Sequence, residues 1–80
     1  MLNTMKREQF HNKLDELMEL EAGTISDGAE LSGLIKWDSL ALMGFIAMMD
    51  QRFGLIIPAA RIAECKTVGD LADLAGDHIN

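Results

Sequence analysis

The sequence predicts an all-α fold: a small four-helix bundle in which three longer helices and one short helix enclose a single core. Three stretches of the chain place apolar residues at the spacing of an α-helix, and residues that favour helix ends flank them. A chain of 80 residues has room for one core, so we expect residues 1–80 to form a single domain. A second lobe that could close over a substrate is not expected.

The first helix is expected over residues 5–21. Three apolar residues share one of its faces, because they follow one another at i, i+4 and i+7: Phe10, Leu14 and Leu17. Asn3 or Thr4 can cap its start, and Gly23 can end it. The charged residues between the apolar ones are expected to face solvent: Lys13, Asp15, Glu16 and Glu19.

Residues 22–37 lose the helical period and are punctuated by Gly23, Gly28 and Gly33. This pattern predicts a long loop between the first and second helices, with at most one short helical turn. The apolar residues of the loop are expected to hold it against the core: Ile25, Leu31, Leu34, Ile35 and Trp37.

The second helix is expected from Asp38–Ser39 to Phe53–Gly54, with Asp38 as its N-cap and Gly54 just after its end. The helical period predicts a core face: Leu42, Phe45, Ile46, Met49 and Phe53. The opposite face lacks the usual charges: Leu40, Met43, Gly44, Ala47, Met48 and Gln51. We therefore expect another element or a partner to cover it. Gly44 costs about 1 kcal/mol within a helix, which reflects either neutral drift or the close approach of a partner backbone.

After the second helix, residues 55–58 are expected to be extended, because the residue before Pro58 avoids the α region. A short helix is expected over residues 59–64. Thr67 is expected to cap the last helix, and Asp70 completes a variant of the capping box. The inner face of this helix is then apolar: Val68, Leu71, Ala72, Ala75 and Ile79.

Charge and cysteine content narrow the classes of function. The chain has 7 basic and 13 acidic residues, a net charge of −6, which disfavours nucleic acids and anionic membranes and favours a basic partner. The longest apolar run, residues 40–49, is about half of the ~20 residues that a membrane span needs. Cys65 is the single cysteine, so no intramolecular disulfide or zinc cluster is expected. With no apolar signal region at the start of the sequence, a cytoplasmic location is expected.

Ser39 is the side chain that best suits chemistry. It lies in the first turn of a helix, where a phosphate ester on its hydroxyl would meet the positive end of the helix dipole. The plain alternative is that Asp38 and Ser39 form only a capping pair. A hydrolytic role would need His11 or His78 as the base, and both lie among polar neighbours near the ends of the chain, where a solvated histidine is expected. No metal-ligand spacing occurs in the sequence, and no catalytic residue is expected.

The motif Trp37-Asp38-Ser39-Leu40, which opens the second of four helices, resembles that of the acyl carrier proteins. The resemblance covers nearly the whole chain. Other segments match the family at the same separations: Phe53-Gly54, Ile57-Pro58, Lys66-Thr67-Val68 and Asp70-Leu71, with Phe10 and Leu14 in the first helix. The resemblance implies a carrier that is not an enzyme, with 4′-phosphopantetheine attached to Ser39 between Asp38 and Leu40. A phosphopantetheinyl transferase with its own magnesium would supply this group from coenzyme A.

The family also shelters the acyl chain partly between its helices. By resemblance, candidate lining residues are Met43, Ile46, Ala47, Ile57, Ile62 and Cys65. Each of these is otherwise an ordinary core or partner contact, and Cys65 would then be a small buried apolar residue. The implied partners, besides the transferase, are acyl-loading, synthase or acyltransferase enzymes, and the chain is expected to be a monomer.

The sequence departs from the family along the second helix. Family members usually carry several acidic residues there, but this chain has Ala41, Gly44 and Gln51 and keeps Asp38 and Asp50. The expected docking face is therefore apolar, with one acid beside it: Leu40, Met43, Ala47, Met48 and Asp50. Because electrostatic docking sets partner choice, we expect a specialised fatty-acid, lipid or polyketide pathway rather than bulk fatty-acid synthesis.

Several alternatives stay open. The cargo of such a carrier can be a fatty acyl, polyketide, aminoacyl or sugar-modifying acyl group. Aminoacyl and peptidyl carriers usually have glycines just before the serine, so Lys36-Trp37-Asp38 favours the acyl type. The alternative from another class is a helical interaction domain without a prosthetic group, which would bind a protein through the apolar face of the second helix.

Overall fold

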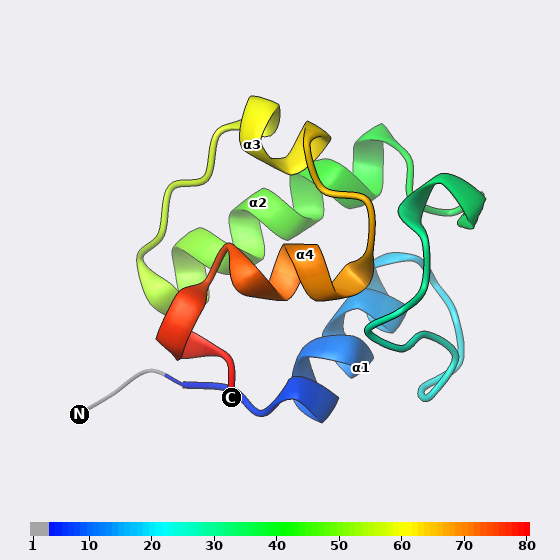
Figure 1. Cartoon of the computed structure of the whole chain (residues 1–80), viewed down its shortest axis with the longest axis horizontal. Helices are drawn as coiled ribbons and strands as arrows, with labels where there is room; N and C mark the ends of the chain where they lie inside the picture. Colours follow the sequence, from blue (N-terminus) through cyan, green and yellow to red (C-terminus); the bar gives the residue numbers. More distant parts are fainter. Residues whose placement is uncertain (1–3) are drawn as a thin grey trace.

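The computed structural model describes residues 4–80, and this part of the chain is helical (Figure 1). Its elements follow in order as α1 (Arg7–Leu17), η1 (Leu31–Gly33), α2 (Ser39–Phe53), α3 (Ala59–Ala63), α4 (Val68–Asp73) and η2 (Gly76–His78), where η marks a 3₁₀ turn. The predicted all-α class with four helices is confirmed. The last helix is divided, because α4 ends at Asp73 and the chain continues into η2.

The core lies where α1 packs against α2 and α4, with α3 at one end of the bundle (Figure 1). The Phe45 ring occupies its centre, edge-on to Phe10 and to Trp37, with ring centroids 6.2 and 6.0 Å apart. Such aromatic pairs contribute about 0.5–1.5 kcal/mol beyond the burial of their area. The residues predicted for the inner face of the last helix are all buried: Val68, Leu71, Ala72, Ala75 and Ile79.

The inner face of α2 is turned slightly from the predicted one. Phe45, Met49 and Phe53 are buried as expected, but Ala41 is buried in place of Leu42 and Ile46, which are half-buried. Ala41, Phe45, Met49 and Phe53 are spaced by four residues and form one ridge. The predicted ends of this helix are confirmed, because the Asp38 side chain accepts a hydrogen bond from the Ala41 N–H and Gly54 has φ +67°.

The bounds expected for the first helix were too wide at both ends. Asn3 lies outside the described residues, and the residue before α1 is Lys6 rather than Thr4. Met5 cannot join the helix because its backbone pairs with the end of the chain: Met5 N–H donates to His78 O at 2.7 Å, and Asn80 N–H donates to Met5 O at 2.9 Å. The chain therefore enters α1 from an extended segment that is tied to its own C-terminal residues.

At its other end, α1 stops at Leu17 and does not reach Glu21 or Gly23. Glu19 adopts φ +58°, the left-handed conformation that commonly ends helices. Leu20 N–H then donates to Asp15 O at 2.8 Å, and Glu19 N–H donates to Glu16 O at 3.1 Å. These two bonds form a Schellman motif, here built on a glutamate instead of the usual glycine.

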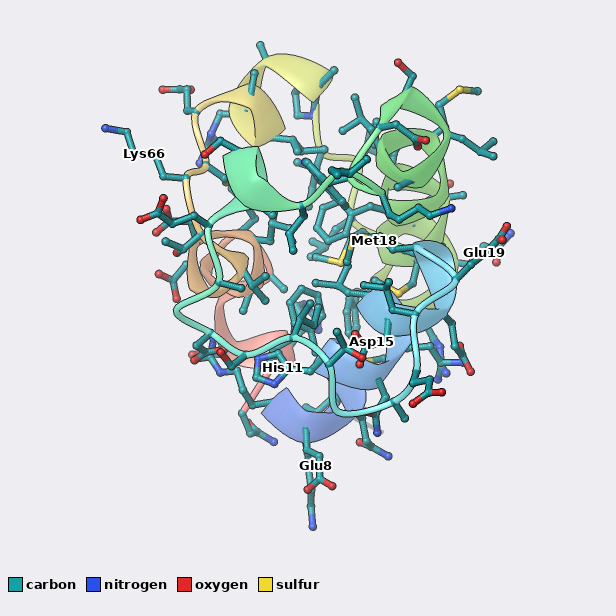
Figure 2. The ribbon with its side chains drawn as sticks, turned by 90° about the vertical axis from the view of Figure 1, so that its right-hand side faces the viewer. Glu8, His11, Asp15, Met18, Glu19 and Lys66 are labelled. Carbon is teal, nitrogen blue, oxygen red and sulfur yellow. The ribbon has the colours of Figure 1, made fainter. Side chains whose placement is uncertain are left out.

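Asp15 is buried, not solvated as predicted from its place between the apolar residues of α1. Its Oδ2 accepts a hydrogen bond from Gly23 N–H at 3.0 Å, and its Oδ1 has no partner within residues 4–80. The reason is tertiary: the chain turns back at Glu19 and covers this side of α1 (Figure 2). Of the other charged residues, Lys13 pairs with Glu16 at 3.3 Å, and Glu19 is exposed as expected.

The loop between α1 and α2 packs against the bundle through Ile25 and Leu31, which are buried, and through Leu34 and Trp37, which are half-buried. Ile35 is 94% exposed, so its predicted place in the core was wrong. Backbone hydrogen bonds hold the loop beside the start of α4: Val68 N–H to Ala29 O, Gly69 N–H to Asp27 O, and Leu31 N–H to Lys66 O. These bonds fix the path of the loop up to η1, the single short turn that the sequence allowed.

The start of each C-terminal helix matches the prediction, but α4 has six residues and ends at Asp73, so it is shorter than the predicted last helix, whose inner face reached Ile79. α3 ends one residue earlier than expected, at Ala63, and its Ile62 is buried. Before α4, Asp70 N–H donates to Thr67 Oγ1, and Thr67 N–H donates to Asp70 Oδ2 at 3.1 Å, which is the predicted capping box. Among residues 4–80, each helix is too short or too polar to cross a membrane.

Candidate functional site

Ser39 is the first residue of α2 and is exposed. Asp38, just before it, places Oδ1 3.0 Å from the Ala41 nitrogen and so caps the helix. Because the cap engages Ala41, the carboxylate helps to define where the helix begins and leaves the Ser39 side chain outside this bond. The predicted pairing of a capping aspartate with an exposed serine is present in the structure.

The surroundings of Ser39 fit a phosphate ester. Within the described residues, its hydroxyl has no hydrogen-bond partner, and the N–H groups of Ser39 and Leu40 are also unbonded. These N–H groups lie at the positive end of a 15-residue helix, which attracts negative charge. The Asp38 carboxylate opposes a second negative charge at the same place, and the helix end offsets part of this repulsion.

Exposed apolar side chains lie on both sides of Ser39 in the sequence. Leu40 is 75% exposed, Met43 is 66% exposed, and Ile35 in the preceding loop is 94% exposed. Leu40 and Asp38 also line a small pocket of about 60 Å³ with the end of α1. The exposure of Ile35 could not be read from its hydrophobicity, because the same property also predicts a core residue.

The predicted docking residues fall into two groups. Leu40, Met43, Ala47 and Asp50 are exposed on the outer side of α2, whereas Met48 is half-buried and turned toward α1. We call the first three of these residues the outer apolar face. This face is uncovered in the described part of the chain, which leaves it open to a partner.

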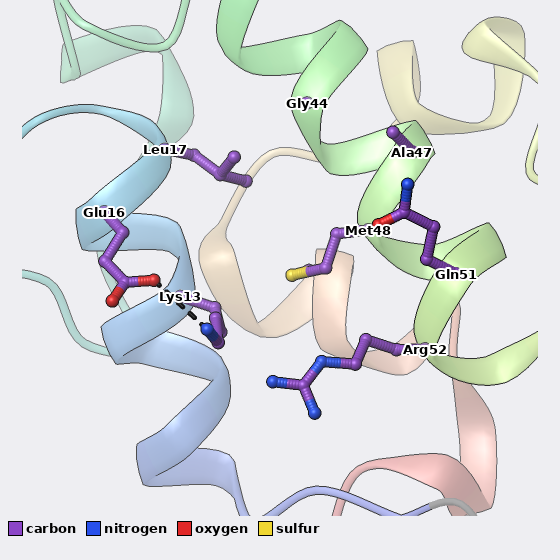
Figure 3. A pocket seen from close by; sticks show the side chains of 8 residues that line it. All are labelled: Lys13, Glu16, Leu17, Gly44, Ala47, Met48, Gln51 and Arg52. Carbon is purple, nitrogen blue, oxygen red and sulfur yellow. Dashed lines mark ion pairs between the residues drawn. The ribbon is translucent and has the colours of Figure 1, made fainter.

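A groove of about 270 Å³ runs between α1 and α2 (Figure 3). α1 lines it with Lys13, Glu16 and Leu17. α2 lines it with Gly44, Ala47, Met48, Gln51 and Arg52. We refer to it as the α1–α2 groove; sequence reasoning missed it, because it depends on how two helices that are distant in sequence pack together.

Gly44 has a packing role within the chain. A Cβ built on it would lie 2.7 Å from Leu17 Cδ2, closer than carbon atoms tolerate. The missing side chain therefore allows Leu17, which is half-buried, to rest on α2. Because Leu17 Cδ2 is the end of a flexible side chain that can move aside, this contact favours glycine without requiring it; approach by a partner backbone stays a prediction.

The candidate lining of an acyl shelter is spread over several places. Ile57 lines a pocket of about 190 Å³ that is formed by the segment between α2 and α3 together with Arg61 and Leu74. Cys65 lines another, of about 500 Å³, with Glu30, Ser32, Lys66 and Thr67. Ile62 is buried and Ile46 is half-buried. The structure thus places Ile57 and Cys65 on different pockets.

Cys65 is a half-buried free thiol. Burial, with further contributions from Asp70 and Glu64, raises its pKa above the ordinary value of 9.0. The thiol is therefore protonated near neutral pH, and a protonated thiol is a poor nucleophile.

Neither histidine is solvated as the sequence suggested. His11 is half-buried beneath the loop, with Nε2 2.5 Å from Asp27 Oδ1 (Figure 2). The His78 ring lies 5.0 Å from that of Phe53, the last residue of α2, whereas Ser39 is the first. At 1.5 Å per residue, these two ends of α2 are about 20 Å apart. The arrangement brings His11 to the loop and His78 to the far end of α2, so it does not assemble a hydrolytic triad around Ser39.

Comparisons with known proteins agree with the geometry. The model of the family described as "Phosphopantetheine attachment site" matches residues 8–75, a range that includes Ser39. An acyl carrier protein of Lactobacillus acidophilus is 28% identical over 78 residues, which cover 92% of this chain and 98% of that protein. No solved structure was found to match the chain. In residues 4–80, no group of three or more metal-ligating side chains is present.

Proposed function

Because this chain belongs to the phosphopantetheine-attachment family and is an acyl carrier protein, we propose that Ser39 is the residue to which its 4′-phosphopantetheine is joined. The chain is a carrier and not an enzyme. The thiol of the attached group holds acyl groups as thioesters. The observation that carries the proposal is the exposed, unbonded hydroxyl of Ser39 at the start of α2.

In the proposed attachment, Ser39 Oγ bonds to the phosphorus that carries pantetheine in coenzyme A. The phosphoanhydride P–O bond breaks, adenosine 3′,5′-bisphosphate leaves, and a base of the transferase takes the hydroxyl proton. Magnesium at the transferase would stabilise the charge on the phosphates. Ser39 needs only to be accessible, since the transferase supplies the base and the metal.

The fold contributes a rigid base for a flexible tether. Asp38 and Gly54 fix the two ends of α2, and Phe45 anchors its middle in the core. A cargo tethered at Ser39 would then be held at a high local concentration when an enzyme docks on α2. This division of labour needs no catalytic group on the carrier itself.

The test is intact-mass analysis after incubation with coenzyme A, magnesium and a broad-specificity phosphopantetheinyl transferase. The wild-type chain is expected to gain one phosphopantetheine, and Ser39→Ala is expected to gain none. Ser32→Ala is the matched control, because Ser32 is an exposed serine in η1. The assignment would be refuted if Ser39→Ala gained the phosphopantetheine, or if the wild-type chain did not.

We further propose that partners dock on the outer apolar face and that the carrier serves a specialised acyl pathway. Support comes from the exposure of Leu40, Met43 and Ala47 at places where charge would normally dominate. An apolar docking surface that contains methionine can adapt to varied partners. Because this surface has few acidic residues, electrostatic steering of basic partner enzymes toward it is weaker. Loading and turnover by general fatty-acid synthases should therefore be slower than for a generic acyl carrier protein; equal rates would contradict this pathway.

The sheltering of cargo is a separate proposal. Ile46, Ile57, Ile62 and Cys65 are its candidate contacts, since all four are buried or half-buried; Ile46 lies on α2, and the other three lie on α3 or its flanking segments. Because Ile57 and Cys65 line different pockets, NMR spectra of the chain loaded with an eight-carbon acyl group should show shifted amide signals at Ile57 or at Cys65, relative to the unloaded chain with its prosthetic group. Shifts confined to the neighbourhood of Ser39 would mean that the acyl chain stays outside the bundle.

A further inference from the structure

We propose that the α1–α2 groove seats a segment of a partner protein that presents a carboxylate to Arg52 beside an apolar side chain. This inference rests on the proposed carrier function and names the chemistry of a docking partner. It concerns the side of α2 that faces α1, whereas Leu40 and Met43 of the outer apolar face lie on the solvent side of the helix, and Ala47 lies where the two surfaces meet.

Arg52 is the basic group of the groove that is left without a partner. Lys13 is paired with Glu16 at 3.3 Å, so its charge is largely balanced. Arg52 has no ion pair or hydrogen bond from its side chain within residues 4–80, and the side chain extends across the groove toward α1 (Figure 3). A guanidinium offers a fork of donors that fits a carboxylate, which makes an acidic side chain the complementary group.

Part of the groove is suited to apolar side chains, while Glu16 and Gln51 also line it. Leu17, Ala47 and Met48 line it, and Gly44 adds no side chain. From Gly44 to Arg52 the groove follows about 12 Å of helix, which is close to two turns of a partner helix. Its volume of about 270 Å³ is below the range of about 300–1,000 Å³ typical of small-molecule pockets, so protein side chains are the better fit.

The charges of Asp50 and Arg52 would also set the orientation of a bound partner around the axis of α2. By the helical period, Asp50 lies on the flank of the outer apolar face away from α1, whereas Arg52 lies on the α1 side. A partner that spans the face would thus meet an anion on one side and a cation on the other. A second copy of the chain is a poor occupant, because each copy carries a net charge of −6 and the two repel.

The experiment uses the phosphopantetheine-bearing chain, checked by intact mass, with a photo-reactive amino acid in place of Gln51. The chain is irradiated in an extract of the cells that produce it, and the crosslinked peptide is identified by mass spectrometry. We expect a segment of another protein with Asp or Glu next to an apolar residue. Arg52→Glu should lower the crosslink yield about tenfold, as loss of a close interfacial charge pair does.

Arg61→Glu is the matched control, because Arg61 is an exposed arginine on α3 outside the groove; its yield should stay within about twofold of wild type. Replacing the identified carboxylate of the partner by lysine should restore crosslinking to Arg52→Glu. The proposal is overturned if Gln51 gives no crosslink, if it crosslinks to a second copy of the chain, or if the crosslinked segment contains no acidic residue. It is also overturned if the lysine substitution in the partner does not restore crosslinking to Arg52→Glu, or if Arg52→Glu and Arg61→Glu lower the yield equally. The prior mass check reports failure of the attachment at Ser39 separately.

Discussion

The inner and outer faces of α2 are both apolar, yet their side chains are used in opposite ways. On the inner face, Phe45 and Met49 are fully buried, at 0% exposure. On the outer face, Leu40 and Met43 are 75% and 66% exposed. Hydrophobicity alone therefore does not separate core from docking surface; the packing of α1 and α4 does. Because Leu40 and Met43 are exposed, they contribute little to folding and are available for function.

The largest effect is expected from a substitution in the inner face, and it concerns the stability of the fold. Phe45→Ala should lower the free energy of unfolding by about 3–5 kcal/mol, because it leaves a cavity beside Phe10 and Trp37. Met43→Ala, on the outer face of the same helix, should change it by less than about 0.5 kcal/mol. Urea unfolding followed by circular dichroism measures both. Similar losses at the two positions would mean that the faces do not differ.

The next largest effect is expected from a substitution in the outer face, and it concerns acyl loading. Met43→Asp should lower kcat/KM for the acyl-loading enzyme about tenfold, because burial of an apolar side chain contributes about 1.5–3 kcal/mol and a charge forfeits it. Ile56→Asp is the matched control, since Ile56 is 85% exposed but lies beyond the end of α2. Loading assays on the chain with its prosthetic group measure both variants. An equal loss from Ile56→Asp would show a general charge effect instead of docking.

A smaller effect concerns the turn at Glu19 that ends α1. Glu19→Gly should raise the free energy of unfolding by about 0.5–1 kcal/mol, because glycine adopts the left-handed conformation at φ +58° without strain. Glu16→Gly, within α1, should instead lower it by about 1 kcal/mol. Thermal unfolding compares the two variants. A loss of stability in Glu19→Gly would contradict the geometry assigned to this turn.

The smallest effect is a pH dependence at the start of α4. The backbone N–H groups of Lys66 and Thr67 hold the pKa of Asp70 below its ordinary value of 3.8. A folded-state pKa below the unfolded one stabilises the fold above the unfolded pKa, and this stability is lost as pH falls through the folded pKa. Asp70→Asn should therefore lose less stability than wild type between pH 4 and pH 2 in thermal melts.

Asp73→Asn is the control for this pH dependence, because Asp73 lies on the same helix and is exposed. It should follow the wild-type decline in melting temperature below pH 4. If Asp70→Asn declined as steeply as Asp73→Asn, the capping box would not be the source of the acid sensitivity.

Local chemistry predicted both ends of α2 and the start of α4, whereas α4 ends at Asp73, short of the predicted helix through Ile79. Asp38, Gly54 and the Thr67–Asp70 capping box act on backbone groups within a few residues, so the sequence contains what is needed to place these helix ends. The end of α1 could not be placed in this way. It depends on Glu19 in a left-handed conformation and on a loop that buries Asp15.

The candidate site divides in the same manner. The exposure of Ser39, Leu40 and Met43 was expected from a capped helix with an uncharged outer face. The α1–α2 groove was not expected, because it requires Arg52 of α2 to lie opposite Lys13 of α1. Ile35 and the two histidines were misplaced for the same reason: their surroundings are set by tertiary packing and not by neighbours in sequence.

The most direct test of the central claim is tandem mass spectrometry of the chain after reaction with a phosphopantetheinyl transferase and coenzyme A. Fragment masses should place the phosphopantetheine on Ser39, the exposed first residue of α2. Localisation to Ser26, Ser32 or another side chain, or a peptide containing Ser39 that stays unmodified, would contradict the account.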